Sequence, residues 1–173
     1  MKIKQLILDA MFIALFVVLS LYATINTGLM KFTFNGLPVI LAGVMFGPVH
    51  GLLVGFAGAF LEQLLTYGLG PTTMLWVIPA MARGLLVGGY AKHRGYNLKK
   101  TELLILIVIS SVVVTTLNTG ALYLDSMIFD YYAKIFDTVL IYRYLAGIIT
   151  AVLYAVVVPI IHRLLSKHLK LGK

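Results

Sequence analysis

The chain has 173 residues, of which 61% are hydrophobic and 12% are charged, and its mean hydropathy is +1.00. This composition differs strongly from the roughly half-apolar, quarter-charged composition of soluble domains, so we expect an integral membrane protein. The absence of cysteine excludes disulfides and thiolate chemistry. A spanning helix needs ~20 apolar residues, so residues 1–173 are predicted to form a single transmembrane domain.

The apolar runs predict an all-α bundle of six transmembrane helices, at about residues 6–25, 36–46, 48–65, 74–91, 102–122 and 138–165. The second helix is short because Gly47-Pro48 interrupts the run, and proline disfavours helix at the residue before it. Gly51, Gly55 and Ala59 share one face of the third helix, which should press closely against a neighbour. Pro79 is expected to kink the fourth helix.

The basic residues are concentrated in three places: the N-terminal lead, the connection KHRGYNLKK after the fourth helix, and the C-terminal tail. Lysine and arginine near span ends mark the cytoplasmic side, so both termini are predicted to be cytoplasmic. The net charge of +8 is then an orientation signal that also attracts anionic lipid. We therefore expect the lipid bilayer, and not a nucleic acid, as a partner.

Two ionisable residues interrupt the long apolar runs, Glu62 and Arg83. A charged side chain at bilayer depth costs at least ~2.5–3.5 kcal/mol on insertion scales, so both should face protein, ligand or a wet cavity. Arg83 lies about ten residues into its helix, or ~15 Å at 1.5 Å per residue, which is close to the midplane. We infer that these two residues line a solute site.

With the predicted topology, further polar residues converge on one outward-facing region, as a binding pocket requires. The predicted substrate-binding residues are Asn35, Glu62, Gln63, Tyr67, Thr73, Trp76, Arg83, Asn118, Tyr123 and Arg143. Plainer interpretations stay open, because the aromatic residues could form an interfacial belt and Glu62 could pair with Arg83 or Arg143 in a structural ion pair. His50 is interpreted as a packing or interfacial histidine.

The sequence contains no G-x-x-x-x-G-K-[ST], H-E-x-x-H or G-x-S-x-G motif. Its histidines are dispersed, whereas metal ligands occur in clusters. We therefore predict no catalytic residue, no metal site and no cofactor, and expect a transport protein that is not an enzyme. Such a chain must use an ion gradient, release solute passively, or depend on a separate motor.

Several features together resemble one family: the length, the six spans, the short second helix, the G-P-x-x-G-x-x-x-G run at residues 47–55, and the pair Ala10 and Ala14. They are similar to the membrane-embedded S components of energy-coupling factor (ECF) vitamin transporters. The resemblance implies a bacterial plasma membrane protein that captures a vitamin with high affinity, in a pocket made by the first outer loop and helices four to six. It also implies docking on a transmembrane coupling subunit driven by two ATPases, with Ala10 and Ala14 as contacts for that subunit.

The identity of the substrate stays open. Glu62 with Gln63 could bind the donor edge of a pterin or pyrimidine, an arginine could bind a carboxylate, and Trp76 could stack on a flat ring. This chemistry favours a folate-like vitamin first, and pantothenate or another vitamin second. Folate-type members usually have an aromatic P-G-F-T segment before the fourth helix, whereas this chain has GLGPTTMLW.

Two other classes of function also remain. One is a gradient-driven transporter of a small solute, although no inverted repeat is evident in the sequence. The other is a structural membrane subunit without a ligand, in which the polar residues only hold helices together.

Overall fold

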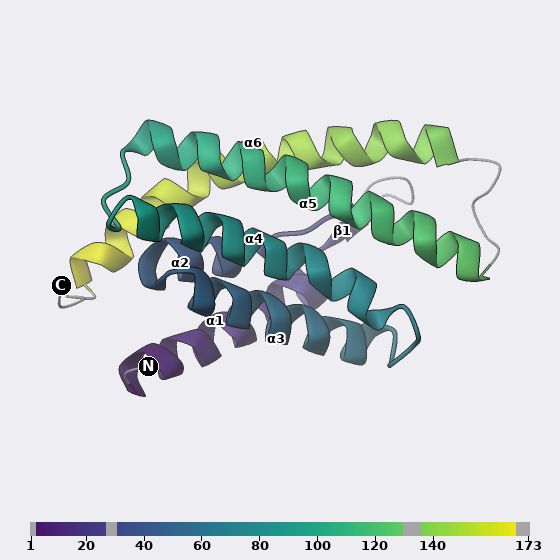
Figure 1. Cartoon of the computed structure of the whole chain (residues 1–173), viewed down its shortest axis with the longest axis horizontal. Helices are drawn as coiled ribbons and strands as arrows, with labels where there is room; N and C mark the ends of the chain where they lie inside the picture. The colour runs from purple at the N-terminus through teal and green to yellow at the C-terminus, as the bar shows by residue number, and fades with distance from the viewer. Residues whose placement is uncertain (1–2, 27–30, 130–135, 169–173) are drawn as a thin grey trace.

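The computed structural model describes residues 3–26, 31–129 and 136–168. Within these residues the chain forms six helices and one short antiparallel ribbon (Figure 1). The helices are α1 (Ile3–Tyr22), α2 (Gly36–Phe46), α3 (Pro48–Thr66), α4 (Thr73–His93), α5 (Lys100–Phe129) and α6 (Phe136–His168). The ribbon pairs β1 (Ile25–Asn26) with β2 (Lys31–Phe32) and lies between α1 and α2 in the sequence.

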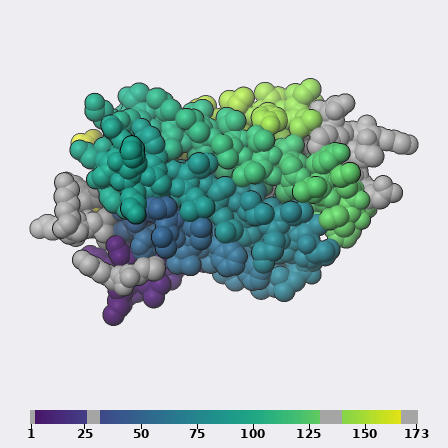
Figure 2. Space-filling view, viewed as in Figure 1, coloured from purple at the N-terminus to yellow at the C-terminus, as the bar shows by residue number. Residues whose placement is uncertain are grey.

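The short helix α2 lies at the centre of the bundle, and all of its residues are buried. In Figure 1, α5 and α6 run along the upper edge and α1 and α3 along the lower edge, with α2 and α4 between them. The hydrophobic core takes side chains from every helix, including Phe16, Ile40, Val54, Val77, Ile107 and Tyr154. The side chains of α3, α4 and α5 close over one face of the molecule (Figure 2).

Five helices are long and apolar enough to cross a membrane: α1, α3, α4, α5 and residues 140–165 of α6. The helix α2 has 11 residues, or ~16 Å at 1.5 Å per residue, which is about half of a ~30 Å hydrocarbon core. Of the six predicted helices, five therefore have spanning length, and α2 is the short second helix that the sequence predicted, with the same bounds. The physical reason is Gly47, which takes a φ of 99° and ends α2 directly before Pro48.

The predicted glycine face of α3 packs against α4, as expected. A Cβ atom added at Gly51 would lie 2.6 Å from the carbonyl oxygen of Gly84, and one added at Gly43 on α2 would lie 3.0 Å from the backbone nitrogen of Gly88. Backbones approach this closely only where both residues are small. The helices α2, α3 and α4 thus form a tightly packed block, which we call the glycine block.

The bounds of α1, α5 and α6 each differ from the prediction by two to seven residues. α1 ends at Tyr22 because the chain turns into the ribbon at Ile25, and α5 continues to Phe129 instead of ending near residue 122. Residues 123–129, which lie between the predicted fifth and sixth helices, contain no proline or glycine and include Asp125, which is buried. Of the other residues between the two predicted helices, 130–135 lie outside the described residues and 136–137 belong to α6. α4 is continuous through Pro79.

The glycine block gives a direct test of the packing. The substitution Gly84→Ala should lower the free energy of unfolding by ~1–3 kcal/mol, because the added methyl group meets the backbone of Gly51. Gly89→Ala is the matched control on the same helix, since an added Cβ there has no neighbour within 4 Å. Thermal unfolding in detergent measures both variants. Equal stability of the two would contradict the packing described here.

Candidate functional site

The segment of residues 33–36, between β2 and α2, makes polar contacts to several helices. The side-chain amide nitrogen of Asn35 donates hydrogen bonds to Ser20 Oγ at 3.0 Å and to Glu62 Oε2 at 3.1 Å. Asn35 is partly buried, and Glu62 is 8% exposed. Asn35 therefore joins α1 to α3, and it brings two of the predicted site residues into direct contact.

Tyr154 of α6 holds the same segment from the other side. Its side chain is fully buried. Its hydroxyl donates a hydrogen bond to the carbonyl oxygen of Thr33 at 2.8 Å and accepts one from the backbone N–H of Gly36 at 3.1 Å. One phenol thus fixes both ends of the four-residue segment.

Arg83 of α4 lies over the Tyr154 ring, with its guanidinium carbon 5.5 Å from the ring centre. The side chain is only 8% exposed. A cation at this distance from an aromatic face is attracted by the ring quadrupole, more strongly where water is excluded. Within the described residues the buried Nε of Arg83 makes no hydrogen bond. A guanidinium with an unused donor in a dry site is suited to bind a carboxylate or carbonyl oxygen.

Gly36 is the residue that lets this arrangement form. A Cβ atom placed there would lie 2.8 Å from the Tyr154 hydroxyl and would overlap Nη1 of Arg83. No side chain larger than hydrogen therefore fits between the arginine and the backbone. Because Gly36 follows Asn35, the Asn35–Glu62 contact and the Arg83–Tyr154 contact are joined through adjacent residues.

The other predicted substrate-binding residues are distributed over the same helices. Thr73 is buried at the start of α4, where its hydroxyl accepts a hydrogen bond from the backbone N–H of Gly70 at 2.9 Å. Of the remainder, some are partly buried and others are exposed: Gln63, Trp76, Asn118 and Arg143 belong to the first group, and Tyr67 and Tyr123 to the second. Their part in a common site stays a prediction.

Sequence reasoning missed Tyr154, Ser20, Thr33 and Gly36. Tyr154 carried a usable signal, because a phenol in the middle of an apolar helix must find a hydrogen-bond partner. The contacts of Thr33 and Gly36 are made by backbone atoms and had no signal in the side-chain pattern.

A second polar cluster joins α1 to α3. Nδ1 of His50 lies 2.6 Å from Oδ2 of Asp9, and both side chains are buried. The rings of Phe46 and His50 lie 5.6 Å apart. His50 is thus a buried hydrogen-bonding residue, which agrees with the packing alternative. Among the described residues, no group of three or more His, Asp or Glu side chains could hold a metal ion.

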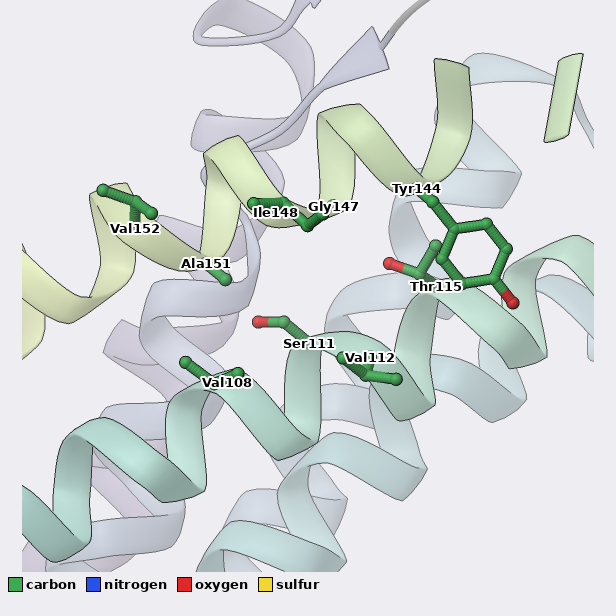
Figure 3. A pocket seen from close by; sticks show the side chains of 9 residues that line it. All are labelled: Val108, Ser111, Val112, Thr115, Tyr144, Gly147, Ile148, Ala151 and Val152. Carbon is green, nitrogen blue, oxygen red and sulfur yellow. The ribbon is translucent and has the colours of Figure 1, made fainter. Parts of the chain in front are cut away.

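One cavity of about 100 Å³ lies between α5 and α6 (Figure 3). Its lining is almost entirely apolar and comes from nine residues: Val108, Ser111, Val112, Thr115, Tyr144, Gly147, Ile148, Ala151 and Val152. None of them is a predicted substrate-binding residue. The cavity is also smaller than the ~300–1,000 Å³ that ligand pockets occupy, so it does not have the size of a vitamin site.

Known proteins share both the fold and parts of the sequence. The crystal structure of FolT bound with folic acid superposes with a TM-score of 0.55 and 20% identity, covering 87% of this chain and 91% of that chain. This likeness shows a common fold.

Two curated relatives match part of the sequence. A UPF0397 protein of Leuconostoc citreum (strain KM20) is 37% identical over 95 residues, which is 53% of this chain and 49% of the relative. A UPF0397 protein of Lactobacillus johnsonii (strain CNCM I-12250 / La1 / NCC 533) is 30% identical over 92 residues, 52% of this chain and 49% of the relative. The matches thus span about half the length of these relatives.

The family model described as the ECF transporter, substrate-specific component, matches residues 4–162. The match includes all or part of each of the six helices and both polar clusters. The chain therefore belongs to the substrate-specific components of ECF transporters.

Proposed function

We propose that the chain captures a small water-soluble vitamin for an ECF-type ABC importer, with a folate-like compound first and pantothenate or another vitamin second. The observation that carries the proposal is the buried Arg83, whose Nε makes no hydrogen bond within the described residues. An ionisable residue inside a spanning helix indicates a functional site by default. Family membership supplies the class of function to which this arginine belongs.

The chemistry of the site supports a ligand with both donor and acceptor groups. Glu62 accepts hydrogen bonds, Asn35 can donate and accept, and Arg83 donates. A folate-like compound presents carboxylates to an arginine and ring donors to a carboxylate. Pantothenate presents a carboxylate but has no ring to stack on Trp76. The fold shared with FolT, which was solved with folic acid, also supports the folate-like choice.

The entry route follows from the topology that we propose. With both termini in the cytoplasm of a bacterial cell, residues 23–35 form the first outer connection, and the Asn35 side of the site faces outward. A ligand arriving from outside would then meet Asn35 and Glu62 first and reach Arg83 by displacing residues 33–36. Delivery would follow docking on the transmembrane coupling subunit and its two ATPases.

The first test identifies the ligand. Native mass spectrometry of the protein purified in mild detergent should show a bound small molecule that carries a carboxylate. Calorimetric titration with folic acid and with pantothenate then ranks the two choices. A folded protein that carries no molecule and binds neither compound would contradict capture of these vitamins and would favour a structural membrane subunit.

Arg83→Ala tests the role of the buried guanidinium. Loss of a hydrogen bond to a charged group is worth ~1.5–3 kcal/mol, so the affinity for the compound identified above should fall roughly 10- to 100-fold. Arg163→Ala, at an exposed position of α6, is the matched control and should leave the affinity unchanged.

Folding is measured alongside binding for the arginine variant. Tyr154→Phe provides a second variant, because it keeps the ring under Arg83 and removes only the hydroxyl. If Arg83→Ala unfolds the protein while Tyr154→Phe keeps full affinity in a folded chain, the cluster serves folding and not ligand binding.

A further prediction concerns the outer face of α1. Ala10 and Ala14 are exposed there, and small side chains let another helix approach closely. The double variant Ala10→Leu, Ala14→Leu should abolish co-purification with the coupling module and vitamin uptake, while ligand affinity stays unchanged. Val156→Leu, at an exposed position of α6, is the control. Unchanged uptake by the double variant would remove this assignment.

A further inference from the structure

The rotation of α1 about its own axis needs an explanation. Its buried residues are Asp9, Phe12, Phe16 and Ser20, and most of its remaining surface is both exposed and apolar. Lipid tails are as apolar as leucine, so burial of apolar side chains does not by itself select one face of a spanning helix. The contact that selects the buried face must therefore be polar or must depend on shape.

The Asp9–His50 pair supplies a polar contact that fits only one rotation. The two side chains meet at 2.6 Å and are 1% and 8% exposed. The second oxygen of Asp9, Oδ1, is buried without a hydrogen-bond partner among the described residues. Any rotation that separates Asp9 from His50 leaves two polar groups in an apolar environment. A buried polar pair that fixes the register of a helix is the best-attested use of such pairs.

His50, the partner of Asp9, lies on a helix of the rigid glycine block. His50 lies two residues after Pro48, where α3 begins. The preceding Gly47 packs under Tyr96, whose hydroxyl would be 2.6 Å from an added Cβ, and Gly51 packs on the backbone of Gly84. The glycine block therefore holds His50 in place, and the pair fixes α1 to this block.

We propose that the Asp9–His50 pair sets the rotation of α1 and thereby keeps Ala10 and Ala14 on its outer face. At 3.6 residues per turn, Ala10 and Ala14 point about 100° and about 140° away from Asp9. A rotation of that size would expose Asp9 and bury the alanines. The consequence for docking rests on the proposed function, whereas the rotation itself does not. Asp9 and His50 are positioning residues, since neither lies in the site of Arg83 and Glu62.

The rotation can be measured with a spin label, because the chain has no cysteine and a single introduced cysteine gives one labelled position. Ala14→Cys reports the exposed face, and Ile13→Cys reports a partly buried position. In the otherwise native chain, the label at position 14 should be more accessible to oxygen dissolved in the bilayer than the label at 13. Adding Asp9→Leu should reduce the ratio of the two accessibilities, position 14 over position 13, at least about twofold. The swap Asp9→His with His50→Asp should restore it.

A label at Val156→Cys on α6 is the control and should not change in any of these variants. An unchanged ratio in the Asp9→Leu chain would overturn the proposal, and so would an equal change at position 156, which would show general loosening. If the Asp9→Leu chain does not purify, Asp9→Asn and the swap decide the outcome. Both keep a hydrogen bond to residue 50, so a changed ratio in either would also overturn it.

Docking is measured on the same variants. Asp9→Leu should lose co-purification with the coupling module at least about tenfold while its affinity for folic acid stays unchanged, and the swap should recover the co-purification. If the ratio changes and co-purification does not, the rotation stands and the assignment of Ala10 and Ala14 to docking fails. Failure of the vitamin proposal would appear separately, as absent ligand binding in the native chain.

Discussion

The candidate site depends on the two hydrogen bonds that the hydroxyl of Tyr154 makes. This hydroxyl bonds the carbonyl of Thr33 and the N–H of Gly36, so α6 is tied to the segment that leads into the central helix. The same segment reaches α1 and α3 through Asn35 and α4 through the Gly36–Arg83 contact. In a low-dielectric interior each unmade hydrogen bond is costly, so the hydrogen bonds of this segment hold α1, α3 and α6 together around it.

The glycine block gives this network a fixed base. Close backbone contacts among α2, α3 and α4 leave no room for side-chain adjustment, because a single added methyl group would meet backbone atoms. The site residues Glu62 and Arg83 both stand on helices of this block, which places them by backbone geometry. Of the three helices outside the block, α1 and α6 are attached to it by polar contacts: Asp9 with His50 and Ser20 with Asn35 for α1, and Tyr154 with residues 33–36 for α6.

This division gives the fold two kinds of surface with different functions. The interior of the bundle keeps charged and polar groups away from lipid. In our proposal, this interior is where the ligand is captured. The outer face of α1 is apolar and small at Ala10 and Ala14, which suits contact with another membrane helix. One polar pair relates the two surfaces, because Asp9 faces the interior while the adjacent Ala10 faces outward.

Much of the fold was predictable from local pattern. Gly47-Pro48 specified the break between α2 and α3, and the predicted bounds of α2, α3 and α4 lie within two residues of those observed. The glycine face of α3 was also predicted, because its spacing repeats every four residues. The end of α5 was not, since residues 123–129 carry both polar and apolar side chains, and only packing decides whether such a segment continues as helix.

The sequence by itself determined that the protein is a helical membrane protein, that α2 ends at Gly47-Pro48, and that Glu62 and Arg83 are buried. Apolar length, a proline and the cost of charge in lipid can each be read from the residues without knowing the packing. Only the tertiary structure decided the partners of Glu62 and Arg83. Asn35 lies 27 positions from Glu62, and Gly36 lies 118 positions from Tyr154. Contacts over such separations depend on how the helices pack, and backbone groups, which make several of them, are the same at every position of a sequence.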